Sequence, residues 1–380
     1  PLEFSNTEAG FMMFKAWVED IAEKQGKTAV IPGMEPTGHY WFALGKFLQD
    51  SGMKPVHVNP HHVKKSKELD DNNPNKNDRK DPKTIAALVN EGRFSYPYIP
   101  TGIYAEIRSL SNLRFQTQEE LTRIARWFAI YFPEYKDVYG DLMAVSGRMI
   151  LKEAPLPEDI RILGVNGVNQ IWRNAKLRGT GMKRAKILVS AAEHSVGSKE
   201  APEAARIELK NLLNDMDVYV SRMEELLQTI EEKLKTIPYV DKLMEIKGIG
   251  LITVSGFIAE VGDIGRFDNP KQLQKLAGYA IVANDSGKHN GESRISYRGR
   301  KRLRYVLYEA AISLVGKNAE FKEIHEYYRT RKENPLKKMQ SVVAVACKII
   351  RVFYTILTKG VDYDPMKLMS DIRRPQLQAA

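Results

Sequence analysis

One apolar seam between Leu209 and Ile237 constrains the fold of this chain more than any other feature. Its residues recur at alternating steps of four and three for four heptads, Glu and Lys flank them, and Pro238 ends the pattern. A seam this narrow is typical of a coiled coil, because a helix packed into a core shows a wider stripe. We therefore expect a long helix that pairs within the chain or with a second chain. Its members are Leu209, Leu213, Met216, Val220, Met223, Leu227, Ile230, Leu234 and Ile237.

The first hundred residues show a different, alternating pattern. Helical spacing up to Gly26 is followed by a short strand candidate, "TAVIPG", then by a second helical stretch up to Gly52 and a second strand candidate, "KPVHVNP". This order is typical of half of an α/β sheet, in which sites gather at the carboxyl ends of strands. Glu35 stands at such an end.

Two further carboxylates follow this pattern. The Asn/Asp/Lys-rich residues 68–77 predict a loop, and "PKTIAALVNEG" predicts a helix that ends at Gly92. Asp78 and Asp81 would share a face of a continuous helix and could join Glu35 in supplying the oxygen ligands that Mg²⁺ prefers. The alternative is an ordinary helix start, with Asp81 as N-cap and Pro82 at the first helical position, which leaves Asp78 in the loop.

Positive charge is concentrated in one segment. The chain carries a net charge of +11, and residues 287–304 contain seven Lys/Arg against one acid. Such a segment suits contact with a phosphate backbone, although a solvated basic face without a partner has the same composition. We expect Arg300→Ala with Arg302→Ala to weaken nucleic-acid binding. The basic residues are Lys288, Arg294, Arg298, Arg300, Lys301, Arg302 and Arg304.

Two glycine-containing turns add candidate contacts. Gly248 and Gly250 separate two apolar helical stretches, as in a helix-hairpin-helix motif whose amides hold a phosphate, and a tight turn without a ligand is the alternative. Ser286 stands in a polar turn, where a nucleophile could reach a phosphate held by the arginines, or where it is simply a turn residue. His289 could act as base or phosphate contact, or be incidental.

The remaining features point to a soluble, cytosolic protein. We expect no membrane-spanning segment, because no apolar run approaches the required length. "VVAVACKIIRVFYTIL" predicts a buried packing helix. The single cysteine, Cys347, lies in this run and predicts a core residue, with a catalytic thiol as the alternative.

Taken in order, several motifs resemble one known family. "GMEPTGHYW", "VNP", "NKNDRKDPKTIAALV" and "GRFSYPYIP", followed by "IKGIG" and "DSGKHNGESRISYRGRKRLR", are similar to the insertion sequence 110 family of DEDD transposases, which are related to Piv DNA invertases and bridge-RNA-guided recombinases. The resemblance covers nearly the whole chain. It implies an α/β plus all-α protein with three parts: a RuvC-like domain of ribonuclease H fold at 1–105, a helical coiled-coil region at 106–238, and a mainly helical transposase domain at 239–368.

The same resemblance implies site residues and chemistry. Glu35, Asp78 and Asp81 match the second, third and fourth acids of the family's Mg²⁺ site, and Ser286 matches its serine nucleophile, with Ser293 and Ser296 as neighbouring alternatives. The first acid belongs upstream of "FSNTEAG", so we expect an incomplete RuvC-like domain that lacks its first strand, and an inactive form or a fragment of an active enzyme. Pro82 stands where a small helix former is expected.

The implied partners are double-stranded DNA of the element ends and target, a guide non-coding RNA, and further copies of the chain in a dimer or tetramer. The implied setting is the cytoplasm of a bacterium or archaeon, at the nucleoid. Two other functions remain open: a RuvC-like junction nuclease that uses water, and a non-catalytic nucleic-acid-binding remnant.

Overall fold

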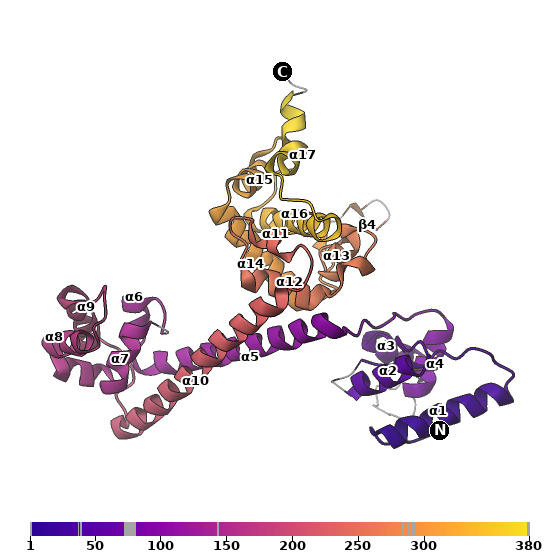
Figure 1. Ribbon diagram of the computed structural model, residues 1–380, viewed down its shortest axis with the longest axis horizontal. Helices are drawn as coiled ribbons and strands as arrows, with labels where there is room; N and C mark the ends of the chain where they lie inside the picture. Colours follow the sequence, from indigo (N-terminus) through magenta and orange to yellow (C-terminus); the bar gives the residue numbers. More distant parts are fainter. Residues whose placement is uncertain are drawn as a thin grey trace. The chain divides into compact units, whose positions relative to one another are not determined.

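The chain divides into two compact units, Pro1–Pro100 and Thr101–Ala380. The computed structural model describes residues 2–36, 38, 40–71, 81–142, 144–282, 285–286, 289–290 and 294–377 (Figure 1). These residues are mainly helical, as expected for most of the chain. The three-part division expected from the motifs stays a prediction.

Unit 1 has the predicted alternation of helices and strands. The strands are shorter than expected, and β1 pairs with β2 in parallel, with Gly33 opposite Val56 and Met34 opposite His57. This small sheet does not by itself establish a ribonuclease H fold, which stays a prediction. The elements are α1 (Glu8–Lys24), β1 (Gly33–Met34), α2 (Tyr40–Asp50), β2 (Val56–His57), α3 (Pro60–Asp71) and α4 (Asp81–Asn90).

The prediction of a loop at residues 68–77 is wrong for the first residues of that range. Helix α3 continues through Asp71, and Lys65 Nζ lies 2.8 Å from Glu68 Oε2, a spacing of three residues that favours a helix. Composition alone missed this helix because ion pairs along one face offset its polar character. Residues 72–77 lie outside the described residues.

Helix α4 packs directly on β1. A Cβ atom at Gly33 would lie 2.6 Å from Val89 Cγ2 and 3.1 Å from Ile85 Cγ2, so only glycine lets the helix approach this closely. The helix begins at Asp81, which is its first residue and not an N-cap before it, and Pro82 lies in its first turn, where a proline is tolerated. Asp78 lies outside the described residues.

In the part of unit 2 that the structure describes, helices are joined by two pairs of short strands. Its first part comprises α5 (Gly102–Tyr131), α6 (Tyr135–Tyr139), α7 (Val145–Glu153), α8 (Pro157–Asn174), α9 (Met182–Glu193) and α10 (Pro202–Leu234). Its second part comprises α11 (Val240–Met244), α12 (Leu251–Val261), a 3-10 turn (Ile264–Arg266), α13 (Pro270–Leu276), β3 (Ile281–Val282), β4 (Asp285–Ser286), β5 (His289–Asn290), β6 (Arg294–Ile295), α14 (Lys301–Lys317), α15 (Ala319–Thr330), α16 (Lys338–Lys359) and α17 (Pro365–Leu377).

The long helices α5 and α10 run antiparallel and cross each other (Figure 1). Tyr131 at the end of α5 donates a hydrogen bond to Glu208 near the start of α10 at 2.6 Å, and Lys233 near the end of α10 pairs with Glu106 near the start of α5. The apolar seam of α10 is therefore buried against a helix of the same chain. A coiled coil between chains stays a prediction.

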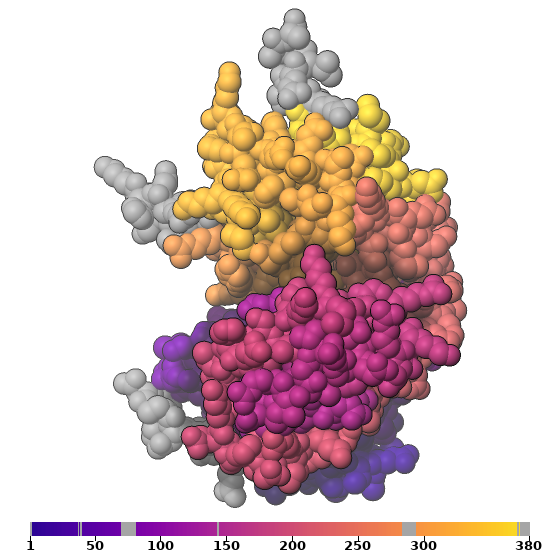
Figure 2. Space-filling view, turned by 90° about the vertical axis from the view of Figure 1, so that its left-hand side faces the viewer, coloured from indigo at the N-terminus to yellow at the C-terminus, as the bar shows by residue number. Residues whose placement is uncertain are grey.

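The seam contributes to two separate cores. The helical core, formed with α6–α9, contains the N-terminal part of the seam and Leu121, Ile124 and Phe128 of α5. The C-terminal core, formed by α11–α17, contains Ile230 and Leu234 of the seam and Ile107 of α5. Figure 2 shows the side chains over the helical core, in magenta, as one continuous surface.

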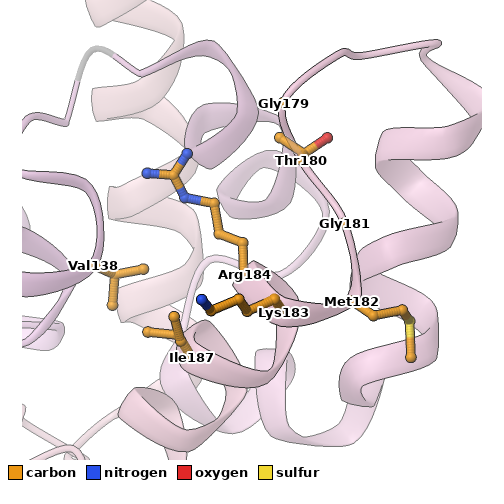
Figure 3. Close-up of a pocket in the computed structure, with 8 residues that line it drawn as sticks. All are labelled: Val138, Gly179, Thr180, Gly181, Met182, Lys183, Arg184 and Ile187. Carbon is orange, nitrogen blue, oxygen red and sulfur yellow. The ribbon is translucent and has the colours of Figure 1, made fainter.

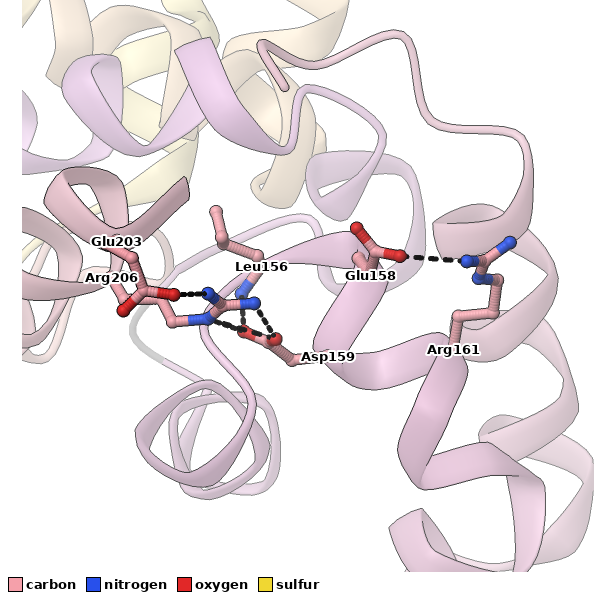
Figure 4. A network of polar contacts seen from close by, with 6 residues as sticks. All are labelled: Leu156, Glu158, Asp159, Arg161, Glu203 and Arg206. Carbon is pink, nitrogen blue, oxygen red and sulfur yellow. Dashed lines mark hydrogen bonds and ion pairs between the residues drawn. The ribbon is translucent and has the colours of Figure 1, made fainter. Parts of the chain in front are cut away.

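A polar network fixes α8 on α10 (Figure 4). Asp159 accepts a hydrogen bond from the Leu156 amide at 3.2 Å and so caps the start of α8. The same carboxylate accepts from Arg206 of α10 at 2.7 Å, and Glu203 accepts from Arg206 at 2.8 Å. The Arg206 side chain is 33% exposed and that of Asp159 is 17% exposed. Solvent therefore weakens this ion pair, which orients the two helices more than it stabilises them.

Helix α16 corrects one expectation. By length and hydropathy it could cross a membrane, contrary to the prediction that no segment reaches that size. It packs in the C-terminal core through residues such as Val345, Ile349 and Phe353, which confirms the predicted packing helix. Burial raises the pKa of the Cys347 thiol on this helix to about 11, so the thiol stays protonated at neutral pH, as a packing residue does.

Candidate functional site

Glu35 follows β1 and lines a cavity of about 340 Å³ in unit 1. The side chain is half-buried, so it is neither a freely solvated charge nor a core residue. This position agrees with the expectation that a site lies at the carboxyl end of the strand. The cavity is otherwise lined by Phe4, Asn6, Phe11, Met34, Tyr40, Trp41 and Leu44.

Asp81 is the first residue of α4, on the face that also carries Ile85 and Val89. Because Ile85 and Val89 cover Gly33, this face lies on the strand that leads to Glu35. The carboxylate of Asp81 forms an ion pair with Lys67 of α3, and both side chains are largely buried. Lys67 therefore competes with any cation for this oxygen.

The metal site that the motifs predict is not assembled among the described residues. Asp78 lies outside the described residues, and among those described no three His, Cys, Asp or Glu side chains gather as metal ligands. Glu35 and Asp81 offer the carboxylate oxygens that suit Mg²⁺, and β1, which Glu35 follows, packs on α4, which Asp81 begins. The donor chemistry therefore fits the predicted ion, while the ligand set stays a prediction.

His57 is a residue that the sequence reasoning missed. It lies opposite Met34 in the parallel pair, and its ring packs edge-on against Trp41 at 4.1 Å between centroids. Its Nε2 atom is buried without a hydrogen-bond partner, and burial lowers the pKa of the imidazole, so the ring is neutral at pH 7. Only its place at the end of the second strand could have marked it in the sequence.

Ser286 lies in a hairpin. It is the last residue of β4, and its partner in the antiparallel pair is His289 of β5, so two residues separate them. A second antiparallel pair, β3 with β6, encloses this pair in the sequence, and we call the two strand pairs together the ribbon. Gly287 and Lys288 lie outside the described residues, as does Ser293.

Ser296, the other alternative nucleophile, is engaged in holding the ribbon. Its Oγ donates to the Gly278 carbonyl at 3.4 Å and accepts from the Arg298 amide at 3.3 Å. Its own amide donates to the Ala280 carbonyl at 2.8 Å. These contacts favour a structural role for Ser296.

The basic residues around the start of α14 divide into two groups. Arg294, Arg298 and Lys301 are exposed. Arg300 donates to the Glu260 carbonyl at 2.8 Å and lies 3.5 Å from its carboxylate, and Arg304 donates to the Ala277 and Tyr297 carbonyls at 3.0 and 3.2 Å. Arg302 bonds to Asn112 of α5 and lies over the Phe115 ring at 4.8 Å. The inner arginines therefore also hold the C-terminal core together.

The Gly248–Gly250 turn joins α11 to α12, as the hairpin pattern predicts. The Gly248 carbonyl accepts from Ser313 Oγ at 2.8 Å, so the turn docks on the C-terminal half of α14. Gly250 is exposed and precedes α12 without a side-chain cap, which leaves the first amides of that helix available to an anion. Phosphate binding here stays a prediction.

A second basic loop was not singled out from the sequence. A cavity of about 510 Å³ lies before α9, lined by Gly179, Gly181, Lys183 and Arg184 among others (Figure 3). The Arg184 guanidinium lies 5.0 Å from the centre of the Tyr139 ring. The signal in the sequence is "KLRGTGMKRAK", in which five cations and two glycines occur without an acid.

Two family models match the chain. One, for DEDD transposases of the IS110 type, matches residues 2–129, and one described as transposase IS116/IS110/IS902 family matches residues 240–329. The first includes Glu35, Asp78 and Asp81, and the second includes Gly248, Gly250, Ser286 and the basic segment.

Individual proteins are similar over most of their length. An uncharacterized 44.8 kDa protein of insertion element IS116 from Streptomyces clavuligerus is 24% identical over 290 residues, 74% of this chain and 71% of that protein. An uncharacterized 42 kDa protein of IS900 from Mycobacterium paratuberculosis is 22% identical over 75% of this chain and 73% of its own length. The transposase for IS1111A of Coxiella burnetii is 24% identical over 74% of this chain and 65% of its own length.

Proposed function

The chain belongs to the IS110 family of insertion-sequence transposases, and from this premise we propose that it cuts and rejoins DNA by forming a covalent bond between Ser286 and a DNA phosphate. The observation that supports this most is the position of Ser286. It belongs to the inner strand pair of the ribbon, and the outer strand β6 leads, through exposed Arg298, into the basic start of α14. In the chain, this nucleophile is followed closely by cations that could hold the phosphate it attacks.

The proposed step is a phosphoryl transfer. The Ser286 hydroxyl oxygen attacks the scissile phosphorus and loses its proton to a base, the phosphorus–oxygen bond of the DNA strand breaks, and the leaving oxygen takes up a proton. The product is a protein–DNA phosphoester and a free hydroxyl end. Attack of another hydroxyl end on this ester reverses the step without loss of the bond, which suits recombination better than hydrolysis does.

Unit 1 would hold the metal ion. Glu35 and Asp81, with Asp78, offer carboxylate oxygens for Mg²⁺, and a bound Mg²⁺ polarises a phosphate and lowers the barrier to attack on it. Lys67 holds the Asp81 carboxylate in place in the absence of the ion. Glu35 is kept half-buried beside its cavity, where a bound ion would be less screened than on an open surface.

The partners follow from charge and family. Exposed Arg294, Arg298 and Lys301 suit the backbone of double-stranded DNA, and a structured guide RNA would be held by shape and backbone contacts. Two or more copies of the chain would hold both DNA duplexes in one synapse, in the cytoplasm of the host cell. The second candidate function, a junction nuclease that uses water, is favoured only by the carboxylates of unit 1.

The test uses end-labelled element-junction DNA with Mg²⁺ and co-purified RNA, resolved on a denaturing protein gel. It compares the present chain, a form extended at its N-terminus through the family's first acid, and that form with Ser286→Ala or, as matched control, Ser296→Ala. We expect a labelled protein–DNA adduct in the extended form that Ser286→Ala abolishes and Ser296→Ala retains.

Each other outcome has a definite meaning. Cleavage without any adduct would support the junction nuclease and refute the serine mechanism. An adduct that survives Ser286→Ala would move the nucleophile to another residue. DNA binding without cleavage or adduct in the extended form would leave a non-catalytic binding protein.

A further inference from the structure

Helix α5 carries a polar stretch between the two cores. Its buried face runs from Ile107 in the C-terminal core to Leu121 in the helical core, and the buried residues between them are Ser111, Arg114 and Thr117. Arg114 is the unexpected member, because only 6% of its surface is exposed. A long cation at this point of a helix seam costs stability unless something compensates its charge.

Nothing in the described part of the chain compensates Arg114 with a hydrogen bond or an ion pair. Its guanidinium carbon lies 4.5 Å from the centre of the Phe115 ring, so the guanidinium stacks on this aromatic side chain. Burial lowers the pKa of Arg114, the nearby Tyr305 raises it, and the neighbouring Arg302 lowers it.

A second arginine shares the same aromatic ring. The Arg302 guanidinium lies 4.8 Å from the Phe115 ring centre and bonds to Asn112. Within the described residues no carboxylate pairs with Arg302 either. Two cations beside one ring, without an acid, repel each other and attract an anion.

The start of α14 adds to the positive charge around the Phe115 ring. Arg302 belongs to the first turn of this 17-residue helix, and Arg300 precedes it without a side-chain cap. The first amides of α14 are therefore unsatisfied by a cap, and the helix dipole favours negative charge at this end. Tyr305, one turn further, is exposed and packs edge-on against Phe115 at 6.4 Å.

We propose that Arg114 and Arg302 form a seat for one backbone phosphate of bound DNA, with Phe115 as its wall and the start of α14 as its other edge. The proposal rests on the proposed function, since it names a contact within the DNA interface. Arg298 and Lys301, exposed beside the seat, continue the positive surface and favour a polyanion over a free phosphate ion.

The seat gives Arg114 a role that stacking alone does not. A phosphate oxygen between the two guanidinium groups would accept charge-assisted hydrogen bonds from both and remove their mutual repulsion. Arg302 is already oriented by Asn112, so little side-chain freedom would be lost on binding. The DNA would also bridge α5 and α14, two helices that come from distant parts of the chain.

The test measures binding of a labelled DNA duplex to the full chain by fluorescence anisotropy over a range of salt concentrations. Arg114→Met keeps the length of the side chain and removes its charge, Arg114→Lys keeps the charge, and Arg126→Met is the matched control, since Arg126 is an exposed arginine of the same helix. We expect Arg114→Met to weaken binding about tenfold and to lower the slope of log affinity against log salt by about 0.9, the loss of one phosphate contact. Arg114→Lys should restore most of the slope, and Arg126→Met should leave it unchanged.

Thermal unfolding provides a second readout. Without DNA, Arg114→Met should unfold at the same or a higher temperature than the parent chain, because it removes an uncompensated buried charge. Inorganic phosphate alone should raise the unfolding temperature of the parent and not of Arg114→Met. If only inorganic phosphate responds and the DNA slope is unchanged, the seat binds a free ion and the DNA contact is refuted.

The two proposals fail in different ways. An unchanged affinity and slope in Arg114→Met, with weaker binding in an Arg298→Ala/Lys301→Ala variant, would refute the seat and leave the proposed function standing. Unchanged binding in both variants would refute the DNA interface around α14 itself. A lower unfolding temperature of Arg114→Met with normal phosphate response would show a structural role and also refute the seat.

Discussion

Replacing Arg300 should lower the stability of unit 2 even when no DNA or other ligand is bound. Arg300 Nη1 donates to the Glu260 carbonyl at 2.8 Å and lies 3.5 Å from Glu260 Oε2. Glu260 is only 8% exposed, on a stretch of α12 that is otherwise apolar. Arg300→Met therefore leaves a buried carboxylate without its cation and a buried carbonyl without a donor.

The size of the effect follows from this burial. Removing one partner of a fully buried ion pair costs about 3 to 5 kcal/mol. Because the Arg300 side chain is 23% exposed, we expect a smaller loss, about 2 to 3 kcal/mol. In a unit of this size that corresponds to a fall of roughly 5 to 10 °C in unfolding temperature. Glu260→Gln in the same chain should recover about half of the loss, because the buried charge is then gone.

The assay is thermal unfolding followed by circular dichroism, with hydrogen exchange of the α12 amides as a local readout. Exchange in α12 should accelerate in Arg300→Met and slow again in the double variant. A loss below about 1 kcal/mol, or a double variant that is no more stable than Arg300→Met, would refute the pairing as a buried contact. The result bears on binding experiments, since Arg300→Ala weakens the fold and the interface together.

Two further outcomes are expected. Gly248→Ala should lower the free energy of unfolding by about 1 to 3 kcal/mol, because Gly248 has φ +102° and an added Cβ would lie 3.2 Å from Leu314. Gly250→Ala should lower it by less than about 1 kcal/mol, because Gly250 has φ −134° and open space around it. Equal losses in thermal unfolding would contradict this expectation. Burial, together with the charge of Arg329, lowers the pKa of His325, so the folded state disfavours protonation of this imidazole. The contribution of neutral His325 to the free energy of unfolding is therefore complete above the unfolded pKa near 6.5, and it is lost as the pH falls through the lower pKa of the folded state. His325→Gln should flatten the fall in unfolding free energy below about pH 6.5 measured by urea titration, and an unchanged pH profile would refute the assignment.

The sequence predicted the elements better than the directions of their side chains. The alternation of helices and strands before residue 60, the helix after Asp81 and the packing helix near the C-terminus are confirmed because their apolar periods are strong. The seam of α10 was recognised, but its partner α5 was not, since its buried face is interrupted by Ser111, Arg114 and Thr117.

The basic segment shows why the site could be predicted only in part. Charge density marks residues 287–304, but it cannot separate the exposed Arg298 from Arg300, whose contact with Glu260 depends on a helix 40 residues away. Arg114 lies even farther from the basic segment in the sequence. The neighbouring contact between Asn112 and Arg302 joins residues 190 positions apart. A single arginine in a helix has no signal in the sequence until the packing is known.

The order in which α5 and α10 leave the ribosome has a consequence for synthesis of the protein. Helix α5 is complete at Tyr131, but α10, which covers the apolar face of α5, begins only at Pro202. Just before α10, the Ser198 amide donates a hydrogen bond to the Ile130 carbonyl and so brings the chain back to the end of α5. Translation of the roughly 70 intervening residues takes several seconds. During that time Ile124 and Phe128 have no partner from α10 to cover them, so this nascent chain is most open to aggregation, or to capture by a chaperone, in the middle of its synthesis.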